Sequence, residues 1–202
     1  MNSWFRLTKP GVVILLQITA ISAVLVHDLM SETRPALSHT LEASLITLVG
    51  GYLTAGGSNA INMWYDKDID PMMKRTSNRP VPLGEVKSEH ALLFGISISL
   101  LGVIWFTLMA GQIAAFWATF SILFYVFVYT IWLKRRTVQN IVIGGLAGST
   151  PPLIGWFVAM GPSDLDLNSM NGFLVSITDT GSLVPFYICL LYTSDAADDR
   201  DS

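Results

Sequence analysis

Long apolar segments alternate with short polar links along most of this chain. Apolar runs cover residues 11–27, 41–64, 91–110, 113–133 and 141–160, and a sixth run begins near residue 182. A helix rises ~1.5 Å per residue, so about 20 apolar residues cross the hydrocarbon layer of a bilayer. The pattern therefore predicts an all-α, polytopic bundle of transmembrane helices, with about five complete spans and a broken sixth.

The composition supports a membrane protein and narrows the possible chemistry. Hydrophobic residues make up 51% of the chain, charged residues 13%, and the mean hydropathy is +0.51. Soluble domains carry about 25% charged residues. The single cysteine, Cys189, excludes a disulfide framework and a cysteine-rich metal cluster. We expect the lipid bilayer as a partner and no nucleic acid.

Lysine and arginine are concentrated in alternate links between the apolar runs. Residues 1–9 hold two, residues 65–90 hold five and residues 134–140 hold three, whereas the other links before the sixth run hold only Arg34. By the positive-inside rule, the N-terminus and both basic links should face the cytoplasm. The two links that carry candidate chemistry are therefore predicted to lie on one side of the membrane.

The link after the second apolar run begins with a regular set of polar residues. Asn62, Asp66 and Asp70 follow one another at intervals of four, which places them on one face of a helix. Two carboxylates that lie so close repel each other unless a cation binds between them, and carboxylate oxygens suit Mg²⁺. The spacing predicts that Asp66 and Asp70 bind Mg²⁺ and that Asn62 orients the ion or a phosphate oxygen. Asp68 falls on another face and should be solvated.

A basic segment follows this acidic face directly. Lys74, Arg75 and Arg79 come shortly after Asp70, and the Asp70–Pro71 pair favours an extended turn that folds the segment back. Arginine and lysine beside a metal-binding carboxylate pair are suited to a diphosphate group. We therefore predict that these three cations hold a diphosphate next to the metal.

These motifs together resemble a known family. Asn62-Xaa₃-Asp66-Xaa₃-Asp70, followed by the basic residues 74–80, is similar to the first aspartate motif of the UbiA-type intramembrane prenyltransferases. Residues 7–10, 75–80 and 129–140 resemble the branch of that family that farnesylates protohaem IX, and the likeness covers roughly residues 4–187. The resemblance implies a Mg²⁺-dependent enzyme of a bacterial plasma membrane. Its substrates would be farnesyl diphosphate and haem B, and its product haem O.

The resemblance also implies further site residues and partners. Lys134 and Arg135 correspond to a second basic contact with the substrate. Lys9 either faces the same cavity or only anchors the N-terminus at the membrane surface. A haem A synthase or oxidase assembly proteins would be the partners that receive the product.

The aromatic residues of the fourth apolar run permit two interpretations. The run contains Phe116, Trp117, Phe120, Phe124, Tyr125, Phe127, Tyr129 and Trp132. They could face lipid and the membrane interface, as aromatic belts do. Alternatively, some could line an apolar tunnel for an isoprenoid tail, because the carbocation-like fragment left by diphosphate departure must be kept from water.

The C-terminal part of the chain departs from this pattern. A second acidic motif of the family is absent, and Asp164, Asp166 and Asp179 should lie on the opposite membrane face. Residues 189–202 are acidic, and residues 189–198 resemble a translated sequencing adapter. We therefore expect residues 1–188 to form a partial prenyltransferase domain and residues 189–202 to be a non-native tail without a packed role. Such a chain should bind diphosphate weakly and transfer nothing.

Two other functions remain open from the residues alone. A prenyltransferase that acts on an aromatic acid for quinone synthesis would show the same acidic and basic motifs. An ion or anion transporter would place charges near the middle of the bilayer and would show an internal repeat. In this chain the charges gather at the ends of the apolar runs, which favours the enzyme.

Overall fold

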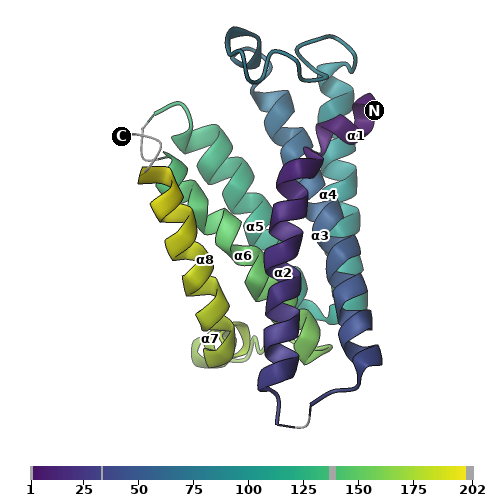
Figure 1. Cartoon of the computed structure of the whole chain (residues 1–202), viewed down its shortest axis with the longest axis vertical. Helices are drawn as coiled ribbons and strands as arrows, with labels where there is room; N and C mark the ends of the chain where they lie inside the picture. The colour runs from purple at the N-terminus through teal and green to yellow at the C-terminus, as the bar shows by residue number, and fades with distance from the viewer. Residues whose placement is uncertain (1, 33, 137–139, 199–202) are drawn as a thin grey trace.

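The computed structural model describes residues 2–32, 34–136 and 140–198, and these residues form a bundle of helices (Figure 1). The long helices are α2 (Pro10–Met30), α3 (Leu37–Tyr65), α4 (Ser88–Ala110), α6 (Asn140–Met160) and α8 (Thr180–Asp198). The shorter elements are α1 (Ser3–Leu7), the 3₁₀ helix η1 (Asp70–Met72), α5 (Gln112–Leu123), the π-helix η2 (Phe124–Leu133) and α7 (Met170–Ile177). The prediction of an all-α bundle is confirmed.

The number of membrane spans differs from the prediction. Four of the described helical segments are long and apolar enough to cross a membrane: α2, α4, the continuous pair α5–η2, and residues 143–160 of α6. Helices α7 and α8, which meet at 63°, give a fifth if they count as one bent span. Helix α3 is not among these segments, so length and hydropathy alone give fewer spans than the five complete and one broken that were predicted. This helix has 29 residues and lies beside α2 and α4, but polar residues at both its ends lower its hydropathy (Figure 1).

Glycines set the close approach of α3 and α4. A Cβ atom added to Gly57 of α3 would lie only 2.6 Å from the backbone oxygen of Gly95 in α4. Small residues at such a crossing allow backbones to approach closely in a membrane, where packing rather than water exclusion holds helices together. The polar C-terminal end of α3 is thereby held against a rigid neighbour.

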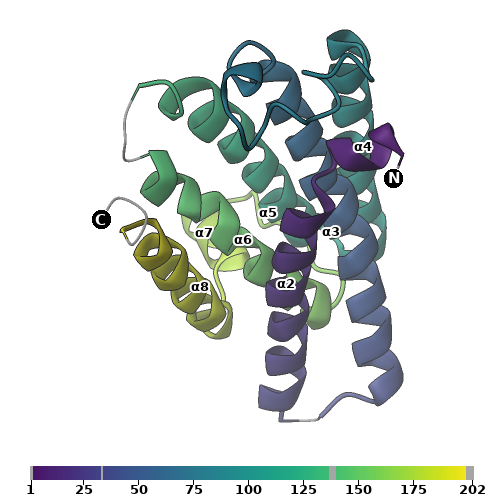
Figure 2. The ribbon, with the colours of Figure 1, turned by 45° about the horizontal axis from the view of Figure 1, so that its top comes forward.

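Both basic links lie at the same end of the bundle. Arg135, after η2, forms an ion pair of 2.7 Å with Asp68, after α3, and Arg6 of α1 forms one of 2.9 Å with Glu85. Figure 2 turns this end toward the viewer and shows the link between α3 and α4 beside α1. The structure thus brings these links together at one end of the bundle, and their common side of the membrane stays a prediction. Which side is cytoplasmic stays a prediction.

The opposite end of the bundle holds the acidic link after α6. The turn at Gly111, between α4 and α5, meets this link, and the backbone amide of Gln112 donates to the carbonyl of Ser163 at 2.9 Å. Asp164 and Asp166 therefore lie far along the bundle from Asp66, as predicted. The link contains α7, whose Phe173 packs edge-on against Phe116 of α5.

Helix α6 continues through two prolines because other groups satisfy its free carbonyls. Pro151 and Pro152 lack the amide hydrogens that would bond the carbonyls of Ala147 and Gly148. The Thr150 hydroxyl donates to Ala147 at 2.8 Å, and the Cys189 thiol of α8 donates to Gly148 at 3.6 Å. Local side chains of this kind allow proline inside a spanning helix.

The suspected tail is part of α8 as far as Asp198. The expectation that it lacks a packed role is therefore wrong for Cys189, which contacts α6. Residues 199–202 lie outside the described residues. The non-native origin of residues 189–202, and with it the division of the chain at residue 188, stays a prediction.

Candidate functional site

The C-terminal end of α3 carries a buried polar stripe. Asn62 is 2% exposed, and Asp66 and Asp70 are 0% exposed. Although α3 ends at Tyr65, the helical path continues, because the amide of Asp66 donates to Asn62 at 3.0 Å and that of Asp70 to Asp66 at 2.8 Å. The predicted shared face of these three residues is therefore present.

Three cations from different parts of the chain converge on this stripe. Arg79 donates from Nη1 to both carboxylate oxygens of Asp70 at 2.8 Å, and Lys134 forms an ion pair with Oδ2 of Asp66. Lys9 donates to Oδ1 of Asn62 at 2.5 Å. Buried carboxylates require such partners, because an unpaired charge in the interior costs several kcal/mol. Arg79 and Lys134 thus balance the two carboxylates, and Lys9 adds a third basic group to the site.

The donor set also fits a hard divalent cation. Oδ1 of Asp66 is buried and has no hydrogen-bond partner within the described part of the chain. The same part of the chain contains no group of three His, Cys, Asp or Glu side chains placed to hold a metal ion. A cation here would therefore use two carboxylates and draw its other ligands from water or substrate phosphate, the arrangement typical of Mg²⁺.

Lys9 reaches the site through a strained backbone. It adopts φ 50° and ψ 65°, a left-handed conformation that is uncommon for a residue other than glycine. The preceding residue, Thr8, is held by the side chain of Asn59, whose Nδ2 donates to the Thr8 carbonyl at 3.0 Å. Burial, followed by the charges of Arg79 and Lys134, lowers the pKa of Lys9 from 10.5 to about 7. Backbone strain of this kind is common at functional sites. In this conformation the Lys9 side chain reaches Asn62.

The other predicted basic residues lie further out. Arg75 is exposed and lines a crevice of about 350 Å³ together with Lys9 and Arg79. Lys74 is also exposed and is not part of that crevice. Arg135 is not brought to the buried carboxylates: its guanidinium pairs with Asp68 and lies 4.6 Å from the Tyr65 ring centroid. Asp68 is exposed, as expected, but it is paired.

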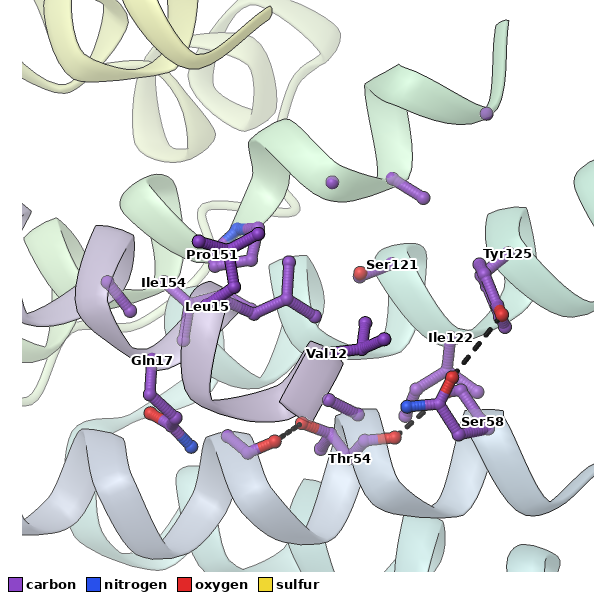
Figure 3. Close-up of a pocket in the computed structure, with 18 of the residues that line it drawn as sticks. Val12, Leu15, Gln17, Thr54, Ser58, Ser121, Ile122, Tyr125, Pro151 and Ile154 are labelled. Carbon is purple, nitrogen blue, oxygen red and sulfur yellow. Dashed lines mark hydrogen bonds between the residues drawn. The ribbon is translucent and has the colours of Figure 1, made fainter. Parts of the chain in front are cut away.

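An apolar cavity of about 410 Å³ begins one turn before Asn62. It lies between α2, α3, the α5–η2 pair and α6, and Figure 3 shows Val12 and Leu15 of α2 on one side and Ile122 and Tyr125 on another. Its polar end contains Asn59, which accepts a hydrogen bond from the Tyr125 hydroxyl at 3.3 Å. The polar stripe thus begins one turn after Asn59, at the polar end of this apolar cavity.

The aromatic residues of the α5–η2 segment divide between the two predicted roles. Tyr125 and Tyr129 line the cavity, whereas the side chains of Phe127 and Trp132 are 58% and 54% exposed on the surface. Sequence reasoning did not single out Tyr125 as a neighbour of α3, nor Thr130, whose hydroxyl accepts from Nδ2 of Asn62 at 3.1 Å. The spacing of Tyr125 and Thr130 from Lys134 could have indicated these contacts. The three residues share one face, however, only if the segment is a π-helix.

Known proteins share both this sequence and this fold. The profile of the UbiA prenyltransferase family matches residues 18–201. A protoheme IX farnesyltransferase of Pelagibacter ubique is 44% identical over 191 residues, which cover 95% of this chain and 59% of that protein. The corresponding protein of Symbiobacterium thermophilum is 46% identical over 164 residues, 81% of this chain and 52% of that protein. The chain therefore spans between half and three fifths of the length of these curated relatives.

Two solved structures of a UbiA homolog from Archaeoglobus fulgidus have the same fold. One is bound to DMAPP and Mg²⁺ and the other to GPP and Mg²⁺, with TM-scores of 0.58 and 0.57. Each is 14% identical in sequence and covers 98% of this chain and 73% of its own. With the family match over most of its length, this chain belongs to the UbiA prenyltransferase family.

Proposed function

We propose that this protein transfers a farnesyl group from farnesyl diphosphate to haem B and so produces haem O. The observation that carries the proposal is the pair of fully buried carboxylates, Asp66 and Asp70, among converging cations at the end of an apolar cavity. The choice of farnesyl and haem rests on the relatives that are protoheme IX farnesyltransferases.

In this proposal the polar stripe and its cations bind the diphosphate. Asp66 and Asp70 would hold Mg²⁺, with Asn62 orienting the ion or a phosphate oxygen. Mg²⁺ would supply stabilisation of the negative charge that develops on the departing diphosphate. Arg79 and Lys134 already lie against the two carboxylates, so they are positioned to share the same phosphate oxygens.

The remaining cations would act from further away. Lys9 and Arg75 line the crevice next to Arg79, and we assign them to the outer side of the diphosphate. Lys74 is exposed and Arg135 is paired with Asp68. We assign these two to attraction of the anionic substrate rather than to direct contact, because exposed charges raise the local concentration of a counter-ion.

The apolar cavity would hold the farnesyl chain. Transfer leaves an allylic fragment with carbocation character, and water in its path would trap it. Aliphatic side chains of α2 and α6 exclude water there, and the rings of Tyr125 and Tyr129 present electron-rich faces that attract a cation. The same apolar lining favours a prenyl tail that arrives from the bilayer.

The location follows from the charge distribution. We propose a multi-pass protein of a bacterial inner membrane with the basic end of the bundle in the cytoplasm. Haem A synthase or oxidase assembly proteins would then take up the product from the membrane.

A chimera tests the function. Residues 1–188 of this chain replace the matching part of the Pelagibacter ubique relative, and membranes that contain the chimera receive farnesyl diphosphate with either haem B or an aromatic acid. We expect haem O by chromatography, and none from the Asp66→Ala version. A prenylated aromatic acid instead of haem O would support quinone synthesis, and the absence of both products would refute the proposal.

A further inference from the structure

Helix η2 matches the polar stripe of α3 residue by residue. Three side chains of residues 125–134 contact Asn59, one turn before the stripe, and two residues of the stripe: Tyr125 contacts Asn59, Thr130 contacts Asn62, and Lys134 contacts Asp66. On α3 these partners are three and four residues apart, as expected on one face of an α-helix. On the facing segment, Tyr125, Thr130 and Lys134 are five and four residues apart. An α-helix would therefore place Thr130 on a different face from Tyr125.

The π-helical register explains how the longer spacing fits. In a π-helix each amide bonds the carbonyl five residues earlier, so residues five apart lie above one another. The amide of Lys134 donates to the Tyr129 carbonyl at 2.9 Å, and the Thr130 hydroxyl donates to the Tyr125 carbonyl at 2.9 Å. The wider turns therefore bring Tyr125, Thr130 and Lys134 onto the face that meets α3. Single π-turns inside helices are frequent at functional sites.

The hydrogen bonds of Thr130 leave one orientation for the Asn62 amide. A threonine hydroxyl has one proton, and that of Thr130 goes to the Tyr125 carbonyl, so its oxygen accepts from Nδ2 of Asn62. The Lys9 amino group donates to Oδ1 of Asn62, which agrees with this orientation. Thr130 is 0% exposed and Asn62 is 2% exposed, so water does not replace either bond.

We propose that Thr130 is a positioning residue for the diphosphate site, because it holds Nδ2 of the Asn62 amide and so keeps Oδ1 on the side of Lys9, where it could face a metal ion. The inference deepens the proposed function and rests on it. Thr130 does not touch the substrate, and its effect passes through Asn62. Partners one step behind a metal site commonly change metal affinity or activity 10–100-fold when they are removed.

The test measures Mg²⁺ binding by the full chain in detergent without relying on turnover. Thermal unfolding is followed by tryptophan fluorescence with excess inorganic pyrophosphate while Mg²⁺ is titrated. The variants are Thr130→Val, which keeps the shape and loses the hydroxyl, and Thr130→Ser, which keeps the hydroxyl. The matched control is Thr119→Val in α5, whose hydroxyl donates to the Ala115 carbonyl of its own helix at 2.8 Å.

We expect Thr130→Val to raise the Mg²⁺ concentration at half-maximal stabilisation by about tenfold or more. Thr130→Ser and Thr119→Val should remain near the wild-type value. In an Asn62→Ala background, Thr130→Val should cause no further change, since the two residues act in series. If Thr130→Val does not fold, Thr130→Cys takes its place, and its weakly hydrogen-bonding thiol should give a smaller rise in the same direction.

Three results would overturn the inference. Thr130→Val could match Thr119→Val, Thr130→Ser could be as impaired as Thr130→Val, or the effect of Thr130→Val could persist without the Asn62 amide. Asp66→Ala separates this failure from failure of the proposed function. If Asp66→Ala abolishes Mg²⁺-dependent stabilisation and Thr130→Val does not weaken it, only the positioning role is wrong. If Asp66→Ala has no effect, the metal site and this inference fail together.

Discussion

Two adjacent cations, Lys134 and Arg135, should contribute very differently to stability. Lys134 pairs with Asp66, which is fully buried, and Arg135 pairs with Asp68, whose side chain is 55% exposed. Substitution of either by methionine removes one charge from the same short segment. The variants Lys134→Met and Arg135→Met therefore differ mainly in the burial of the carboxylate that loses its partner.

The burial of each carboxylate sets the expected magnitude. Removing one partner of a buried ion pair costs about 3–5 kcal/mol, because an uncompensated charge remains inside the protein. In Lys134→Met this charge is that of Asp66, whose Oδ1 already lacks a hydrogen-bond partner among the described residues. For a chain of this length, 1 kcal/mol shifts the Tm by about 2–4 °C, so the Tm should fall by roughly 6–20 °C. The Tm of Arg135→Met should stay near that of the wild type, since exposed ion pairs contribute little.

The assay is thermal unfolding in detergent, with and without Mg²⁺ and pyrophosphate. If Asp66 binds the metal, Mg²⁺ should restore part of the lost stability of Lys134→Met, because a cation again compensates the carboxylate. Equal losses in both variants would refute the burial argument. A loss in Lys134→Met that Mg²⁺ does not reduce would refute the metal-binding role of Asp66.

Three further outcomes follow from the structure. Gly57→Ala should lower the Tm through a loss of about 1–3 kcal/mol, since its Cβ would meet the backbone of α4, and unchanged unfolding would contradict the close packing. Ala55→Phe, which fills the cavity, should weaken binding of farnesyl diphosphate but not of pyrophosphate, as competition assays would show. The Ser3 hydroxyl and then Arg6 lower the pKa of Glu85, so proteolysis of the N-terminal segment should stay slow above the ordinary value of 4.5 and accelerate only below it.

The sequence contained the elements of the site that depend on local spacing. Asn62, Asp66 and Asp70 could be placed on one face because hydrogen bonds four residues apart persist beyond the end of α3. The two basic links could be placed at one end because membrane orientation follows lysine and arginine counts. The first inference needs only the spacing of residues along the chain. The second needs only the number of membrane crossings between the links.

Other features depend on contacts between distant segments. The sequence of residues 124–133 is equally compatible with an α-helix, so the π-helix that aligns Thr130 with Asn62 could not be predicted from it. Lys134 and Arg135 are neighbours of equal charge, so spacing could not reveal which one reaches Asp66 and which one stays at the surface. The packed role of Cys189 depends on the carbonyl that Pro152 leaves free in α6.

Mg²⁺-dependent binding of farnesyl diphosphate tests the central claim most directly. Labelled farnesyl diphosphate is titrated into the chain in lipid nanodiscs, with Mg²⁺ or with a chelator, for the wild type and for alanine variants of Asp66, Asp68 and Asp70. The account predicts weak but Mg²⁺-dependent binding, which is lost in Asp66→Ala and Asp70→Ala and largely retained in Asp68→Ala. Binding that ignores Mg²⁺, or falls equally in all three variants, would contradict it.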